Sequence, residues 1–182
     1  MKGMKKMEKD RIEALAYELL KEFGFSLDEP VDVIDLAKKM NIAVGTANLD
    51  DNVDGFLLID NDDNNLLGSG KNKVIGVNKN RKFAAKRFII AHEIGHYKLN
   101  YKNEKQFAFR ENSHGRNRQE NDIDYFAACL LMPENAIKIA AGELNKSNIA
   151  EIGRTLADKF NVPVESMLRR LEEVDVIKLN EV

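Results

Sequence analysis

The feature that most constrains this chain is the pentapeptide HEIGH at residues 92–96. Residues four apart lie on one face of an α-helix, so His92 and His96 can converge on one metal ion at the ~2.0–2.1 Å of a Zn–N bond. Glu93 lies about 100° around the helix from His92. Its carboxylate can reach water held by such an ion and is poorly placed to ligate the ion. The apolar run at residues 88–91 indicates that this helix is buried.

Zinc-assisted hydrolysis is the chemistry that this pattern favours. A zinc ion lowers the pKa of its water toward about 7, and a neighbouring carboxylate can then take the proton. This is the H-E-x-x-H logic of metallopeptidases, with Glu93 as catalytic base. Such a short pattern also arises by chance, so the prediction depends on a third ligand. Histidine and carboxylate ligands would also suit Mn²⁺, Fe²⁺ or Co²⁺.

A catalytic zinc site takes three protein ligands and keeps one position open. Glu120 is the best candidate for the third, because it begins a predicted helix and lies 24 residues beyond the second histidine of the motif. His114 is a second candidate. Asp124, one turn beyond Glu120, is placed to accept the free ring N–H of a ligating histidine. Cys129 falls on the opposite side of that helix and is expected to be a small buried residue.

Hydrophobic periodicity and turn residues predict an α+β fold. Helices are expected at residues 8–23, 28–40, 82–97, 118–131, 134–141, 148–160 and 164–173, and strands at residues 42–46, 54–60 and 73–78. Turn formers join the last two strands, which are therefore expected to pair antiparallel. The basic stretch 98–117 is expected to be irregular. We expect a small, mostly antiparallel three-stranded sheet packed against the helix of the HEIGH motif, with flanking helices.

Composition is that of a soluble globular protein in a reducing compartment. The chain has 182 residues, 43% of them hydrophobic and 32% charged, which suits one domain. Its single cysteine excludes an intrachain disulfide. The basic start is not followed by the apolar stretch of a signal peptide, and no apolar run approaches the ~20 residues needed to span a bilayer. We therefore expect a cytoplasmic protein without a membrane partner; the oligomeric state stays open.

Charge is unevenly distributed along the chain. Residues 26–66 carry ten acidic and two basic side chains, whereas residues 68–118 carry thirteen basic and three acidic ones. These segments either attract one another on folding or steer an acidic partner toward the motif that lies among the bases.

One domain is expected, with an N-terminal helix (1–25), a catalytic core (26–133) and a C-terminal helical hairpin (134–182). The hairpin has the pattern of a helix-turn-helix. Its second helix offers only Arg169 and Arg170, and the region is net acidic. Direct DNA binding is therefore disfavoured against a packing or substrate-docking role.

Two longer segments make the chain recognisable: RFIIAHEIGH at residues 87–96 and ENDIDYFAACLLMP at residues 120–133. Together they resemble the ImmA/IrrE family of metallopeptidases, as do Asp54-Gly55-Phe56 and Val77-Asn78 in the predicted strands. The resemblance spans most of residues 30–175.

The resemblance implies a small, zincin-like α+β fold with His92, His96 and Glu120 as zinc ligands and Glu93 as the base. Ile123 stands where the family usually has alanine, and a branched side chain there could crowd the ligand shell. His114 is a candidate stabiliser of the transition state, in competition with Tyr97, Tyr101 and Tyr125.

Family members typically cleave a helix-turn-helix repressor and so switch on phage, mobile-element or stress genes. Because no sensory domain follows residue 182, we expect the mobile-element type. The alternative is a zinc-binding regulatory partner that acts on a DNA-binding protein by stoichiometric association, in the manner of a toxin–antitoxin pair or an anti-repressor, without proteolysis.

Overall fold

The computed structural model describes residues 2–59, 72–99, 107–111, 118–144 and 148–178. The chain divides into two compact units, one of residues 32–127 and one that combines residues 1–31 with residues 128–182. The division falls within a helix, α4 (Arg118–Leu131). The first unit contains the HEIGH motif, and the second is built from both ends of the chain.

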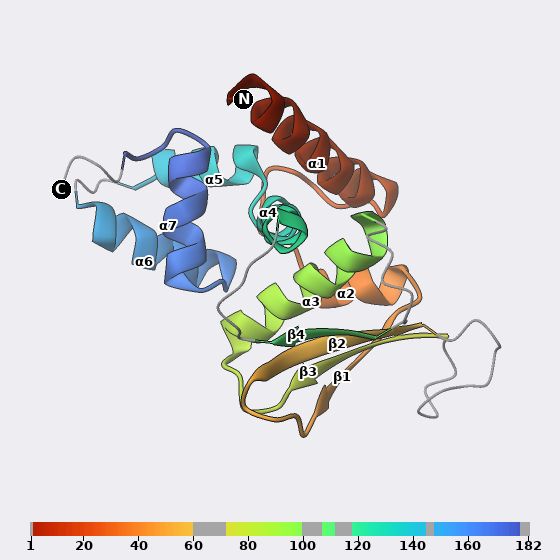
Figure 1. Ribbon diagram of the computed structural model, residues 1–182. Helices are drawn as coiled ribbons and strands as arrows, with labels where there is room; N and C mark the ends of the chain where they lie inside the picture. Colours follow the sequence, from red (N-terminus) through yellow and green to blue (C-terminus); the bar gives the residue numbers. More distant parts are fainter. Residues whose placement is uncertain (1, 60–71, 100–106, 112–117, 145–147, 179–182) are drawn as a thin grey trace. The chain divides into compact units, whose positions relative to one another are not determined.

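The unit of residues 32–127 is a mixed sheet with helices (Figure 1). Its other elements are α2 (Val33–Lys39), β1 (Ala43–Ala47), β2 (Val53–Ile59), β3 (Lys73–Asn78), α3 (Phe83–Leu99) and β4 (Phe107–Glu111). The strand order is β1-β3-β2-β4. β1 pairs parallel with β3, whereas β2 pairs antiparallel with β3 and β4. The predicted α+β class is confirmed, and the three predicted strands are joined by β4.

Two local expectations are corrected by the structure. Residues 107–111, expected to be irregular, form β4 and pair with β2. α2 begins at Val33 rather than near Pro30, because the side chain of Asp32 accepts hydrogen bonds from the amides of Ile34 and Asp35 and so caps the helix there.

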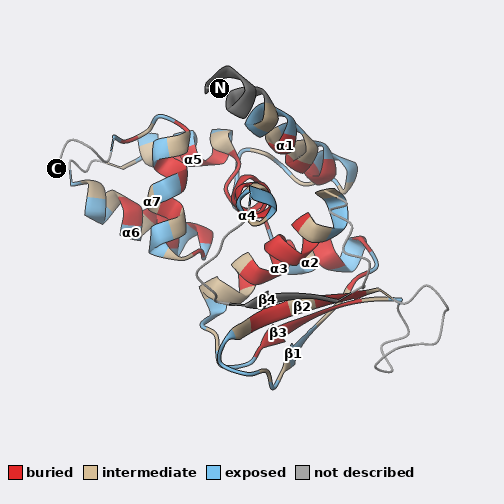
Figure 2. Ribbon diagram, in the orientation of Figure 1, coloured by how far each residue is buried: buried red, intermediate tan, exposed pale blue. Residues whose placement is uncertain are grey.

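α3 contacts β2 and β3 through an apolar face. Ile89, Ile90 and Ile94 are at most 3% exposed, as are Ile75 and Val77 of β3. Figure 2 shows this burial along the middle of α3 and along β3. Burying these side chains between helix and sheet fixes the rotation of α3 about its own axis, and that rotation decides where the motif residues project.

A buried side-chain amide holds the loop that leads into β2. Asn78 is fully buried at the end of β3, and its Nδ2 donates to the carbonyl oxygens of Leu49, Asp50 and Val53 at 3.3, 3.1 and 2.8 Å. The side chain of Arg81 pairs with Asp54 at 2.5 Å. These contacts hold the loop before β2 against the end of β3, and so place Gly55 on the strand.

The second unit contains α1 (Lys2–Glu22), the end of α4, α5 (Glu134–Gly142), α6 (Ile149–Phe160) and α7 (Val164–Glu173). α6 and α7 pack together through Gly153, where an added Cβ would lie 2.5 Å from Leu168. Asn161 ends α6 in the left-handed conformation at φ 51°, which turns the chain directly into α7. The predicted helical pair is therefore present.

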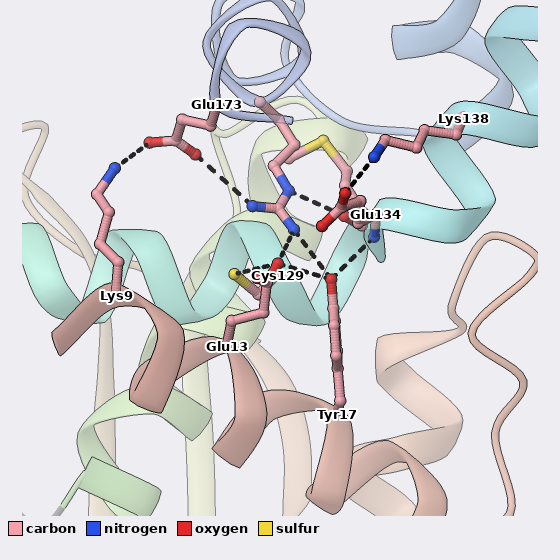
Figure 3. A network of polar contacts seen from close by, with 9 residues as sticks. Lys9, Glu13, Tyr17, Cys129, Glu134, Lys138 and Glu173 are labelled. Carbon is pink, nitrogen blue, oxygen red and sulfur yellow. Dashed lines mark hydrogen bonds and ion pairs between the residues drawn. The ribbon is translucent and has the colours of Figure 1, made fainter. Parts of the chain in front are cut away.

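Arg170 of α7 lies in a polar network of this unit, of which Figure 3 labels Glu13, Tyr17 and Glu134. The arginine is 1% exposed, and its Nη2 donates to Glu13 Oε1 at 2.5 Å and to the Tyr17 hydroxyl at 3.1 Å on α1. Its Nε donates to the carbonyl oxygen of Met132 at 3.1 Å, and the amide of Glu134 donates to the Tyr17 hydroxyl at 2.9 Å. This network joins α1 to α7 and to the link between α4 and α5.

The same network explains why only one of the two arginines in the helix-turn-helix pattern is at the surface. Of the two, only Arg169 is exposed on α7, and its Nε lies 3.4 Å from a carboxylate oxygen of Glu173. Arg170 is thereby removed from the surface that would face DNA. None of the helices in the described part of the chain combines the length and apolarity needed to cross a bilayer.

Removing Arg170 should destabilise this unit far more than removing its neighbour. Arg170→Ala leaves Glu13 and the Met132 carbonyl without their cationic partner, and we expect the free energy of unfolding to fall by about 3 kcal/mol or more. Arg169→Ala, the matched control on the exposed face, should change it by less than about 0.5 kcal/mol. Urea unfolding of both variants measures the difference; equal losses would contradict the role given to Arg170.

Glu13 should make stability depend on acid pH. Burial raises the pKa of its carboxyl, but the hydrogen bonds from Arg170 and Tyr17 outweigh this and leave the pKa below its usual value. The unfolded chain therefore holds the proton more tightly, so the stabilisation is present above the unfolded pKa of about 4.3 and is lost as the pH falls through the lower native pKa. The difference in unfolding free energy between the parent and Glu13→Gln should narrow over this range, as urea unfolding at several pH values would show. A constant difference would contradict this assignment.

Candidate metal centre

Two helices of the 32–127 unit supply the predicted metal ligands. His92 and His96 project from one face of α3, one turn apart, and Glu120 lies in the first turn of α4. Within the described ranges, these three residues are the group of histidine, cysteine and acidic side chains whose donor atoms gather closely enough to hold an ion. Asp124, one turn further along α4, is also at this centre through its contact with His92.

The donor atoms of the three residues lie close together. Nε2 of His92 lies 3.1 Å from Nε2 of His96 and 3.2 Å from Oε2 of Glu120, and Nε2 of His96 lies 3.7 Å from the other carboxylate oxygen of Glu120, Oε1. Ligands at about 2.0–2.1 Å in a tetrahedral shell lie about 3.3–3.5 Å from one another. These separations are therefore close to those around one tetrahedral ion that contacts all three side chains.

The protonation of His92 argues for a cation among these donor atoms. Nδ1 of His92 lies 2.9 Å from Oδ1 of Asp124, and because an ionised carboxylate only accepts, Nδ1 carries the proton. In the neutral ring, Nε2 is then an acceptor, and it faces Glu120, another acceptor. Two lone pairs at this separation need a positive charge between them, which a metal ion or a proton can supply. The donor set therefore fits a metal ion.

Glu120 is held in the ionised form that a ligand needs. The contact with the His92 imidazole is the largest influence and lowers the pKa of the Glu120 carboxyl below its usual value. Burial acts in the opposite direction, as does Asp124, while the charges of both imidazoles reinforce the lowering. A bound cation would favour the carboxylate in the same sense.

Exposure changes across the centre in one direction. The side chain of His92 is 1% exposed, that of His96 12% and that of Glu120 35%. The centre is therefore closed around His92 and open beside Glu120. An ion held here would keep a face toward solvent, as a catalytic site requires.

Glu93 lies next to the first histidine and is fully buried. Its side chain is directed toward β2, because a Cβ built on Gly55 would lie 3.9 Å from Oε1 of Glu93. Gly55 itself cannot carry a side chain without moving its neighbours: that Cβ would lie 2.5 Å from Cγ2 of Ile89 and 2.9 Å from the carbonyl oxygen of Gly76. The bare backbone of β2 thus forms the wall beside the Glu93 carboxylate.

Other sequence candidates lie elsewhere or outside the described residues. His114 and Tyr101 fall in segments that the structure does not describe. Tyr97 is 36% exposed, and its ring lies 4.9 Å from the Lys73 ammonium. Cys129 is in the other unit, with its sulfur 3.7 Å from Oε1 of Glu13, so it does not join the ligand cluster.

Sequence reasoning missed the glycine inside the motif. Gly95 lies against α4, and an added Cβ would be 3.0 Å from Cγ2 of Ile123 and 3.2 Å from Cδ1 of Phe126. Ile123, expected to crowd the ligands, is instead accommodated against this glycine. The available signal was a glycine in the interior of a helix, which costs stability and usually has a packing reason.

Comparison with known proteins agrees with this geometry. A peptidase family model, described as the IrrE N-terminal-like domain, matches residues 37–172 and so includes α3 with its motif and all of α4. No curated protein matches the chain. Since the family model covers well over half of the sequence, the chain belongs to the IrrE N-terminal-like peptidase family.

Proposed function

We propose that this chain is a zinc-dependent endopeptidase, with Zn²⁺ bound by His92, His96 and Glu120 and with Glu93 as the catalytic base. The observation that carries the proposal is the cluster of donor atoms, with separations of 3.1, 3.2 and 3.7 Å, next to a buried carboxylate on the helix of the two histidines. Membership of a peptidase family supports peptide-bond hydrolysis as the reaction.

Each residue of the site has a distinct task. The ion, when bound, would supply Lewis-acid chemistry by acidifying water and polarising the substrate carbonyl. Glu93 would take the proton from the attacking water at a carboxylate oxygen and deliver it to the nitrogen of the leaving amine. Asp124 holds the proton on Nδ1 of His92, which keeps Nε2 of that ring available as a ligand.

The substrate we propose is a helix-turn-helix repressor, whose cleavage would release phage, mobile-element or stress genes from repression. The resemblance of residues 87–96 and 120–133 to ImmA/IrrE peptidases supports this substrate class. Such a substrate places the reaction in the cytoplasm, and the pairing of histidines with a carboxylate leaves Mn²⁺ and Fe²⁺ as other ions that the site could use. A protein that regulates by association alone would need no more of this site than its metal ligands. Catalysis also requires Glu93.

Removal of a ligand should weaken zinc binding in a graded way. Glu120→Ala leaves two protein ligands, and we expect the zinc affinity to fall by at least about 100-fold. Asp124→Asn keeps all three ligands and disturbs only the orientation of His92, so the expected loss is about tenfold. Competition with a chromophoric chelator measures both. If Glu120→Ala kept full affinity, the third-ligand assignment would be wrong and His114 would be tested next.

Replacement of the base should separate catalysis from binding. Glu93→Gln keeps the size of the side chain and removes its ability to accept the proton, so cleavage of a helix-turn-helix repressor that the parent chain cuts should fall by about 10²–10⁴-fold. Zinc content and repressor association should be unchanged, because Glu93 is not a ligand. Glu165→Gln, at an exposed position on α7, is the matched control. A Glu93→Gln protein that still relieved repression fully in cells would favour stoichiometric association.

A further inference from the structure

α3 and α4 lie close together at Gly95, next to the metal centre. This glycine lies between the two ligating positions of α3 and has no Cβ where α4 passes. An added Cβ would meet Cγ2 of Ile123 at 3.0 Å, Cδ1 of Phe126 at 3.2 Å and the carbonyl oxygen of Ile123 at 3.5 Å. Carbon atoms in ordinary contact are about 3.5–4.0 Å apart. A Cβ at residue 95 would therefore be a few tenths of an ångström too close to α4.

The α4 side of this contact has little freedom to yield. Ile123 and Phe126 are both fully buried. Branching at Cβ leaves an isoleucine in a helix with one strongly preferred χ1 rotamer, so Cγ2 cannot swing away from Gly95 without strain. A methyl group added at residue 95 would therefore push α4 outward, because the opposing side chain cannot absorb the contact by rotating.

The position of Ile123 in α4 connects this contact with the ligands. Ile123 follows Glu120 by three residues and immediately precedes Asp124. Glu120 reaches both imidazoles, at 3.2 and 3.7 Å, and Asp124 reaches His92 at 2.9 Å. A displacement of α4 by a few tenths of an ångström would change all three distances together, since the residues share one helical turn.

We propose that Gly95 and Ile123 form a positioning pair that sets the spacing between α3 and α4, and thereby the place of Glu120 and Asp124 at the metal. The inference rests on the proposed function, because it assigns a role toward the same ion. Neither residue touches the metal or the substrate in this role. Ile123 acts as the spacer and Gly95 as the recess that receives it.

A positioning role and a purely structural role predict different effects of Gly95→Ala on metal affinity. Alanine stabilises a helix interior relative to glycine. If Gly95 had no function beyond packing, Gly95→Ala would alter folding stability and leave metal affinity untouched in the folded protein. If the pair positions Glu120 and Asp124, the variant should keep its fold and bind zinc less tightly.

The test measures the zinc affinity of the full chain and the unfolding temperature of the metal-free protein. Gly95→Ala should lower the zinc affinity by about tenfold, the size of effect seen when groups that orient metal ligands are disturbed. Ile123→Leu keeps the side-chain volume and removes the branch that meets Gly95, so alone it should change the affinity by less than about threefold. The double variant Gly95→Ala/Ile123→Leu should recover most of the affinity lost in Gly95→Ala.

Gly142→Ala is the matched control, because Gly142 is also helical and an added Cβ there would meet nothing within 4 Å. It should leave the zinc affinity unchanged. Unchanged affinity in a folded Gly95→Ala protein would overturn the inference, as would a loss that Ile123→Leu does not restore. A parent chain that binds no zinc would overturn the proposed function as well, whereas a parent that binds zinc beside unaffected variants overturns this inference alone.

Discussion

The site depends on a contact between two hydrogen-bond acceptors, Nε2 of His92 and a carboxylate oxygen of Glu120. Asp124 fixes the proton of His92 on Nδ1, so Nε2 presents its lone pair to Glu120 at 3.2 Å. The side chain of His92 is 1% exposed and that of Glu120 35%, so only Glu120 has ready access to water. Two acceptors face to face are unfavourable unless a cation lies between them. The fold therefore favours binding of a positive charge at the point where the three candidate ligands converge.

One ion can contact all three ligands only if α3 and α4 keep a fixed spacing. Glycines on α3 and β2 allow the close packing that maintains it. Gly95 lets α4 approach one side of α3, where Ile123 fits against it. On the sheet side, Gly55 of β2 lets Ile89 of α3 come so near that no side chain could stand between strand and helix. The helix that carries the motif is therefore in close contact on both sides. These two glycines therefore determine how closely the larger side chains on either side of α3 approach the helix.

Local patterns made much of this unit predictable from the sequence. Helical spacing predicted that His92 and His96 share a face, and the bounds predicted for α4 are those of the structure, with Glu120 and Asp124 one turn apart. β4 was missed because its partner, β2, lies about fifty residues earlier in the chain, and because the short apolar run FAF of β4 stands within a polar, basic stretch of sequence. The fit of Ile123 against Gly95 was equally inaccessible, since it depends on how two helices approach and not on either helix alone.

The adjacent arginines of α7 show why a pattern of residue types can support opposite conclusions. In sequence, Arg169 and Arg170 are the cations that a DNA-reading helix would use. In the structure, Arg170 is 1% exposed and satisfies Glu13, Tyr17 and the Met132 carbonyl. A buried guanidinium committed to three acceptors cannot also reach a phosphate without abandoning them, and leaving them unpaired is costly. One of the two cations that a DNA-reading helix could have used therefore joins α7 to α1.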